Sequence, residues 1–290
     1  MSKLPSINQN LIASQDTPLS TEAYKAIVDL VYQHSRIKLG ADKQALLSSR
    51  LGKRLRHLKL ASFDEYCDLL RSHSSQVEID ELIDLISTNH TRFYREPDHF
   101  VFLTEKILPE LLPDLTAKRS ALRIWSAASS SGEEPYTLSI VLSEFFRSHP
   151  SIDWQIWASD ISKTILETAK QGIYRMEVVE PVPADLLKRY FQKGVDSQEG
   201  KCRVKAELRK KVQFERVNLF QNEYPIPHNQ NVIFCRNVMI YFDIPSRELA
   251  VKRLTRYLAP GGYLIVGHSE SLMGIQHNLK AVRQGVYQMP

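Results

Sequence analysis

The sequence lacks any apolar run of the roughly 20 residues that a membrane-spanning helix requires. Residues 1–10 also lack the apolar core of a secretion signal. The three cysteines are too few for a disulfide framework, no two of them have metal-ligand spacing, and the nine histidines form no HExxH motif. We therefore expect a cytoplasmic protein with no direct membrane insertion and no metal.

The apolar pattern divides the 290 residues into three parts. Residues 1–18 are polar and aperiodic, which is typical of a flexible tail. Residues 19–90 repeat apolar side chains at helical spacing, as at Leu47 and Leu51, which predicts a small all-α domain. Residues 91–290 alternate short apolar runs with amphipathic stretches, which predicts a doubly wound, Rossmann-like α/β domain.

The predicted sheet combines buried parallel strands with a terminal hairpin. The last two candidate strands, Leu279–Arg283 and Val286–Met289, are joined by Gln284 and Gly285, which predicts an antiparallel last strand. Residues 172–215 are too long for a connecting loop, so we predict a small inserted β subdomain there. The parallel strands are predicted at Leu122–Ala128, Trp154–Asp160, Val212–Asn218, Val232–Asn237 and Gly262–Gly267, and helices at Pro135–Phe146, Ser162–Gln171 and Pro245–Leu258.

Charge in the predicted helical domain is segregated. Residues 36–59 hold eight cations and one anion, whereas residues 64–84 hold seven anions and one cation. On a helical wheel of about 100° per residue, Arg50, Lys53 and Arg56 form a stripe away from the leucine face. The stripe fits either a solvated helix surface or a docking surface for an acidic partner.

The first predicted strand runs into six small residues, 127–132, which allow a tight turn close to a ligand. Gly132 is the only glycine among them, so this is not the GxGxxG of dinucleotide-binding proteins. Glu133 and Glu134 would repel a pyrophosphate but attract the sulfonium and ammonium groups of S-adenosylmethionine. The turn therefore favours the methyl donor over NAD, although an ordinary tight turn also explains this segment taken alone.

Polar residues follow the other predicted strands. Asp160 ends the second strand, where an acidic residue typically accepts the ribose hydroxyls, although it also fits a helix cap. Asn218 and Leu219 follow the third strand and Asn237 follows the fourth. No Pro-Pro-aromatic sequence comes after Asn237, which disfavours methylation of a flipped base. Residues 88–96 combine donors, aromatics and charge, which fits a polar linker or a lid over the pocket.

Six blocks of the sequence, in order, resemble the CheR family of chemotaxis receptor methyltransferases, over about residues 20–290. The resemblance implies an S-adenosylmethionine-dependent protein-glutamate O-methyltransferase that yields glutamate methyl esters and S-adenosylhomocysteine. The blocks are Thr88–Glu96, Trp125–Tyr136, Ala158–Asp160, Val217–Leu219, Phe234–Asp243 and Gly267–Ser271. The donor contacts implied by the resemblance are Asn89, Thr91, Arg95, Glu134, Asp160, Asn218, Leu219, Asn237 and Val238.

The resemblance also implies a partner. The basic helix would dock on the acidic methylation region of the cytoplasmic helical bundle of chemoreceptors, through Arg50, Lys53, Arg54 and Arg56. Lys53 stands where the family often has Arg, so the charge is kept but bidentate pairing is lost. Some members also bind a pentapeptide at the receptor C-terminus through the inserted subdomain, and residues 194–200 have the length seen in those members. We expect a monomer with no nucleic-acid partner.

Methylation of a carboxylate makes modest chemical demands. A glutamate of pKa about 4.3 is already ionised at neutral pH, so no general base is required and alignment of the reacting atoms dominates. We expect Arg95 and Tyr241, with Arg236 as a further candidate, to orient the substrate carboxylate or the donor, and His268 and Glu270 to be structural. A nucleic-acid methyltransferase and a non-enzymatic adaptor that senses the donor are the alternatives.

Overall fold

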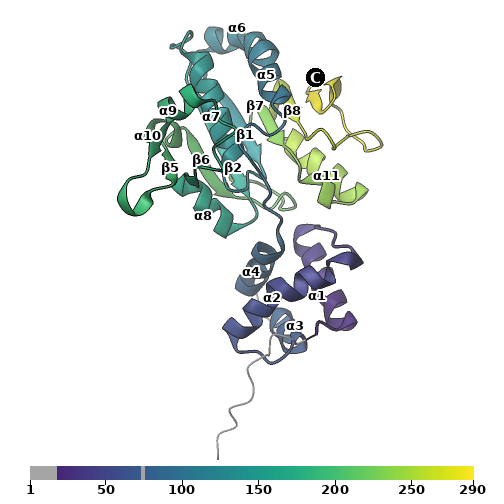
Figure 1. Ribbon diagram of the computed structural model, residues 1–290. Coiled ribbons are helices and arrows are strands. Elements are labelled where there is room, and N and C mark those ends of the chain that lie inside the picture. The colour runs from purple at the N-terminus through teal and green to yellow at the C-terminus, as the bar shows by residue number, and fades with distance from the viewer. Residues whose placement is uncertain (1–17, 73–75) are drawn as a thin grey trace, which may run out of the picture. The chain divides into compact units, whose positions relative to one another are not determined.

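The computed structural model describes residues 18–72 and 76–290, so the predicted tail of residues 1–18 lies outside the described residues except for Pro18. The chain separates into two compact units on either side of the Ser87–Thr88 bond, and each is described by itself (Figure 1). Among the described residues, no helix combines the length and apolar character needed to cross a membrane.

Helices are the only regular elements in the described residues of the first unit, and two of them begin at serine caps. The Ser20 hydroxyl accepts a hydrogen bond from the Ala23 amide, and the Ser62 hydroxyl accepts one from the Glu65 amide. Leu47, one of the leucines predicted to share a face, is 1% exposed. The elements are α1 (Thr21–Ser35), η1 (Ala41–Lys43), α2 (Gln44–Leu58), α3 (Phe63–Arg71) and α4 (Gln76–Ile86).

Two of the four predicted docking cations make contacts inside this unit. Arg54 forms a bidentate ion pair with the buried carboxylate of Glu78, which also accepts the hydroxyl hydrogen of Tyr66. These contacts join α2, α3 and α4. The Arg50 guanidinium donates to the carbonyls of Leu85, Ile86 and Ser87, which satisfies acceptors at the end of α4. Lys53 and Arg56, by contrast, are exposed.

The second unit contains a seven-stranded sheet in the order β6-β2-β1-β7-β8-β10-β9. The first five of these strands are parallel, and β10 pairs antiparallel with both β8 and β9. The predicted fold class is thus confirmed, terminal hairpin included. The strands are β1 (Leu122–Ala127), β2 (Trp154–Asp160), β6 (Val212–Arg216), β7 (Gln230–Cys235), β8 (Leu258–Ile265), β9 (Lys280–Arg283) and β10 (Val286–Gln288).

The central strands are almost continuously buried because helices pack against the sheet, as the near-continuous apolar runs predicted. In Figure 1, α7 (Glu133–Phe146) and α8 (Lys163–Gln171) lie close to β2 and β6, and α11 (Ile244–Thr255) lies beside β8. Each helix follows a strand and carries the chain back from the carboxyl ends of the parallel strands toward their amino ends. The loops after β1, β2, β6 and β7 therefore lie together at the carboxyl ends of the strands, which we call the ligand edge of the sheet.

The predicted inserted β subdomain is present as a second, antiparallel sheet in the order β3-β5-β4. In its central strand β5, Cys202 and Val204 are buried whereas Lys201 and Arg203 are exposed, as expected of a strand with one face on a core. The elements are β3 (Ile173–Arg175), α9 (Ala184–Tyr190), β4 (Phe191–Lys193), η3 (Asp196–Gln198), β5 (Lys201–Val204) and α10 (Ala206–Arg209).

A helical run before β1 was not predicted. It consists of α5 (Asp98–Phe102), a π-helical turn η2 (Leu103–Ile107) and α6 (Leu108–Lys118). Pro109 lies in the first turn of α6, where proline is tolerated, but Pro113 lies inside the helix and obscures the pattern. Buried side chains such as Leu103 and Ile107 outweigh that local preference.

Candidate active site

The turn after β1 has an unusual backbone. Ala128, Ser130 and Gly132 all have positive φ, at 60°, 52° and 97°. Left-handed backbone at the two non-glycine residues costs on the order of 1–3 kcal/mol each and tends to occur at functional sites. Hydrogen bonds offset this cost, because the Ser129 amide donates to the Ser159 carbonyl and the Ser130 amide to the Asp160 carboxylate.

Gly132 is enclosed by the inserted subdomain. A Cβ atom there would lie 2.8 Å from the Tyr174 hydroxyl oxygen and 3.0 Å from the Ala169 Cβ. The same Tyr174 hydroxyl donates to the Ser131 carbonyl at 2.7 Å. The insertion therefore supports the turn from outside, and the one glycine of the motif stands where a side chain would not fit.

Asp160 organises the loops at the ends of β1 and β2. One carboxylate oxygen accepts the Ser130 amide at 2.9 Å, and the other accepts the Ser162 amide at 3.0 Å. Ser162, and not Asp160, caps α8, so the alternative that Asp160 is the helix cap is wrong, and Asp160 supports the cap residue by accepting its amide. The Asp160 carbonyl accepts the Val217 amide, which brings the following residues, Asn218 and Leu219, to the same edge.

A buried arginine ties three loops together. The Arg236 side chain is 1% exposed, and its Nη1 donates to Glu134 Oε2 and its Nη2 to Glu96 Oε2, both at 2.9 Å. Nη2 also donates to the Arg95 carbonyl. We refer to these side chains as the Glu96–Arg236–Glu134 network. Its two carboxylates and single guanidinium leave one net negative charge when all three are ionised.

The network leaves less negative charge at the start of α7 than the sequence predicts. The Glu134 carboxylate is not a free charge awaiting a cationic ligand, because Arg236 and the Ser126 hydroxyl already bind it. Glu133 is buried, which raises the pKa of its carboxyl group against the opposing hydrogen bond from Ser131. The acidic helix start therefore carries less free negative charge than two adjacent glutamates imply.

Glu96 is held in its ionised form. Burial acts to raise the pKa of its carboxyl group, but hydrogen bonds from Asn237 and Arg236 and the charge of Arg236 outweigh burial and lower the pKa to about 2. Asn237 donates from Nδ2 to Glu96 Oε1 at 3.1 Å. Glu96 is the last residue of the segment 88–96, and no role was predicted for it. Its partners Arg236 and Asn237 lie some 140 residues away in the sequence, so no local pattern indicates them.

Asn237 also has a left-handed backbone, with φ at 58°, and Glu270 stabilises that loop. The Glu270 carboxylate accepts the amides of Asn237, Met239 and Gly267, each at 2.7 Å. The structural role predicted for Glu270 is therefore confirmed. A Cβ atom on Gly267 would approach Asn237 Nδ2 to 2.6 Å, so this glycine is needed for the loops to meet.

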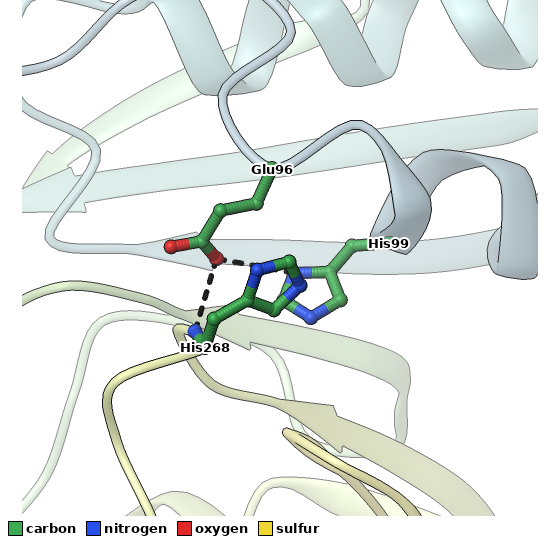
Figure 2. A group of neighbouring side chains, drawn as sticks. All are labelled: Glu96, His99 and His268. Carbon is green, nitrogen blue, oxygen red and sulfur yellow. Dashed lines mark hydrogen bonds and ion pairs between the residues drawn. The ribbon is translucent and has the colours of Figure 1, made fainter.

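Figure 2 shows Glu96 beside the rings of His99 and His268, whose possible ligand atoms lie within 4.8 Å of one another. Such a group could in principle bind a metal. However, the Glu96 carboxylate already accepts hydrogen bonds from Arg236, Asn237 and the His268 amide, and its Oε2 lies 3.5 Å from His99 Nδ1. The adjacent guanidinium would also repel a cation. We therefore propose no metal at this cluster.

The segment of residues 88–96 is anchored within the second unit. Phe93 is fully buried, and its ring makes edge contacts with Tyr174 and Phe191 of the insertion. The Tyr94 amide donates to the Thr137 hydroxyl. A lid in the sense of a loose flap is therefore a poor description, because the middle of the segment is packed into the core.

Hydrogen bonds connect most of the residues that the family resemblance singled out. The Asn89 carbonyl accepts the Ser130 hydroxyl, Arg95 contacts Arg236 through its carbonyl, and Glu134, Asp160 and Asn237 follow through the bonds described above. Thr91, Val238 and Tyr241 are half-buried on the same loops.

A surface cavity of about 380 Å³ lies apart from these residues, and none of the predicted donor contacts lines it. It is lined by Asn222, Glu223, Leu249, Lys252, Arg253 and Arg256.

Substitution of Gly132 tests the turn. Gly132→Ala should weaken binding of S-adenosylhomocysteine about tenfold or more, because the new methyl group must displace Tyr174 or the turn itself. Isothermal titration calorimetry measures the effect. Gly274→Ala is the matched control, since Gly274 has φ at 81° but no atom within 4 Å of an added Cβ. Equal losses in both variants would show that backbone strain alone, and not enclosure by Tyr174, is responsible.

The pH dependence of stability tests the burial of His99. Burial, with the charge of Arg236, lowers the pKa of His99 to about 3, whereas an unfolded chain takes up this proton below about 6.5. The unfolded state therefore binds more protons between these values, and stability falls as pH falls. From pH 7 to pH 5 the loss from this group is about 2 kcal/mol.

His99→Gln should remove that part of the loss. Urea unfolding followed by tryptophan fluorescence measures it for the second unit, which contains all three tryptophans. The exposed His90, changed to Gln, is the control. An undiminished acid loss in His99→Gln would contradict a buried neutral imidazole.

Comparison with known proteins places both units in one family. The family model described as CheR methyltransferase, all-alpha domain, matches residues 22–87, and that described as CheR methyltransferase, SAM binding domain, matches residues 89–287. Among solved structures, a TehB-like SAM-dependent methyltransferase from Corynebacterium glutamicum is 12% identical, with a TM-score of 0.31 over 59% of this chain and 72% of that chain, a likeness too weak to argue from.

Curated relatives match over nearly their whole length. A chemotaxis protein methyltransferase from Salmonella typhimurium is 36% identical over 99% of this chain and 97% of its own. Those from Borreliella burgdorferi and Escherichia coli are each 38% identical, over 93% of this chain and over 94% and 91% of their own. With both units matched, the chain belongs to the CheR family of S-adenosylmethionine-dependent methyltransferases.

Proposed function

We propose that the protein methylates glutamate side chains in the cytoplasmic helical bundle of chemotaxis receptors. The products are a glutamate methyl ester and S-adenosylhomocysteine. The observation that carries the proposal is the match of both units to relatives that are named chemotaxis protein methyltransferases. A nucleic-acid methyltransferase would be expected to match in the donor-binding unit alone, with a different substrate domain.

The proposed donor site lies at the edge where the loops after β1, β2, β6 and β7 meet. Asp160 would accept the ribose hydroxyls, since its carboxylate lies where the ends of β1 and β2 meet and is held there by the Ser130 and Ser162 amides. Asn218 and Leu219 would contact the donor from the loop after β6, and Asn237 and Val238 from the loop after β7. Their proximity to Asp160 and to the Glu96–Arg236–Glu134 network supports this assignment.

The proposed reaction is a single in-line displacement. A carboxylate oxygen of the substrate glutamate forms a bond to the methyl carbon as the bond from that carbon to sulfur breaks. The bonding electrons pass to sulfur, which becomes a neutral thioether, and no proton has to move. Because the nucleophile is already ionised at neutral pH, the enzyme contributes chiefly by holding oxygen, carbon and sulfur in line.

Arg95 and Tyr241 are the residues that we propose to orient the substrate carboxylate or the donor. Both are half-buried, and the Arg95 guanidinium donates a hydrogen bond to the His90 carbonyl. Arg236 was a further candidate for this role. Its guanidinium is buried between two carboxylates, so we propose that it acts by positioning other residues and not by touching the substrate.

Arg95→Ala should lower turnover more than about tenfold, because a positioned cation at a charged substrate contributes mainly to alignment. The assay is transfer of radiolabelled methyl groups to receptor-bearing membranes, with a nucleic-acid sample in parallel. Arg92→Ala, which removes an exposed cation from the same segment, is the control. Turnover near that of the unmodified enzyme in Arg95→Ala would refute its role.

We propose that Lys53 and Arg56 provide the exposed part of the docking surface for the receptor, with Arg50 and Arg54 behind them. The two exposed residues lie three positions apart on α2 and so share one side of that helix. Arg50 and Arg54 keep the helices together through the contacts described above, although their charge still adds to the local positive potential.

Charge reversal separates docking from catalysis. Lys53→Glu and Arg56→Glu should each lower kcat/KM for receptor several-fold at low salt, and less at high salt, because screening weakens exposed charges. Binding of S-adenosylhomocysteine should not change. Lys25→Glu, on the exposed surface of α1, controls for net charge. An equal effect in all three variants would argue against a specific surface on α2.

We also propose that the inserted sheet can bind a receptor C-terminal pentapeptide by strand addition. The order β3-β5-β4 leaves β3 and β4 as edge strands, which is what such binding needs. Calorimetric titration of the pentapeptide tests this, and no binding at millimolar concentration would refute it.

We also propose that the enzyme is a monomer and that it lies in the cytoplasm. Light scattering after size-exclusion chromatography tests the oligomeric state.

A further inference from the structure

Glu96 connects three loops that are distant in the sequence. Its Oε1 accepts Asn237 Nδ2, and its Oε2 accepts Arg236 Nη2 and the His268 amide. Glu96 thus joins the segment of residues 88–96 to the loop after β7 and to the loop after β8. Arg236 extends the connection to Glu134 at the start of α7 and to the Arg95 carbonyl.

The backbone beside this carboxylate would not keep its shape without support. Tyr94 and Glu96 both have left-handed conformations, with φ at 53° and 54°, which non-glycine residues rarely adopt. Arg95 lies between them. Its side chain is therefore directed by a strained stretch of backbone that is fixed on one side by Phe93 in the core and on the other by the Glu96 carboxylate.

We propose that Glu96 is a positioning residue for the methyl donor, which acts by fixing Arg95 and Asn237 through Arg236 and the Asn237 amide. This inference rests on the proposed function, because it assumes that Arg95 and Asn237 contact the donor. Glu96 does not touch the donor itself, since its oxygens face Arg236, Asn237 and His268.

The negative charge of the carboxylate at position 96 is required to hold Arg236, and an uncharged side chain of the same length would not suffice. A glutamine at position 96 could still accept the Asn237 amide through one oxygen. Its NH₂ group would face the Arg236 guanidinium, donor against donor, and would leave that buried cation with one carboxylate where it now has two. Glu96→Asp keeps the charge but is shorter by one methylene group, so it cannot reach both partners at their present distances.

The inference predicts a particular pattern of effects. Glu96→Gln should weaken S-adenosylhomocysteine binding at least tenfold and raise KM for the donor by a similar factor. The value of kcat at saturating donor should fall less than the roughly tenfold expected of Arg95→Ala, because the Arg95 guanidinium is displaced but not removed. The Glu96→Asp variant should bind S-adenosylhomocysteine more weakly than the unmodified enzyme but more tightly than Glu96→Gln. Glu105→Gln, an exposed glutamate of the same unit, is the matched control and should behave as the unmodified enzyme.

A double-mutant cycle distinguishes positioning from a general loss of structure. If Glu96 acts through Arg95, Glu96→Gln should weaken binding much less in an Arg95→Ala background than in the unmodified enzyme. Additive losses would overturn the inference, as would S-adenosylhomocysteine binding within twofold of normal in Glu96→Gln. Tryptophan fluorescence checks folding, and should Glu96→Gln not fold, normal binding by Glu96→Asp would equally overturn it.

Failure of this inference is distinguishable from failure of the proposed function. An unmodified enzyme that binds S-adenosylhomocysteine and methylates receptor, together with an unaffected Glu96→Gln variant, removes only the role of Glu96. An unmodified enzyme that binds no S-adenosylhomocysteine removes both.

Discussion

A buried guanidinium needs anionic partners where it lies, because the protein interior cannot solvate its charge. Arg236 meets that requirement with Glu134 from the start of α7 and Glu96 from the segment that leads into the second unit. The loops after β1 and β7 and the segment of residues 88–96 are therefore held to a common centre. The arrangement of the candidate donor site depends on this one interaction more than on any single loop.

The architecture follows from the sequence where burial alone determines it. The strand β2 has the bounds that its apolar run predicts, and the terminal hairpin forms around Gln284 and Gly285 as expected. The run of α5, η2 and α6 could not be read in the same way. Prolines interrupt its pattern, and its helical form is stabilised by packing of residues such as Leu103 against the sheet.

The site is only partly visible in the sequence, for a physical reason. A strand end followed by Asp160 or Asn237 marks a position at the ligand edge, since parallel strands end at the same side of the sheet. The pairing of Arg236 with Glu96 depends on tertiary structure and leaves no local pattern. The same holds for the basic helix, where a helical wheel places Arg50 beside Lys53 but cannot show that Arg50 binds the carbonyls at the end of α4.

In the proposed function the two units have different roles. The second unit would bind the sulfur nucleoside at its strained, well-supported loops, and the first would present exposed cations on a helix that is stabilised internally by Arg54 and Glu78. Carboxylate methylation needs alignment and little acid-base chemistry. The buried charges of Arg236 and Glu270 hold other residues in place, which fits a site whose proposed task is alignment.

Mass spectrometry of receptor-bearing membranes treated with the purified enzyme and S-adenosylmethionine tests directly whether the enzyme methylates receptor glutamates. We expect methyl ester groups on glutamates of the receptor's cytoplasmic helices, formed only when enzyme and donor are both present. Methyl groups found on nucleic acid but not on receptor, or on no receptor glutamate at all, would contradict this expectation.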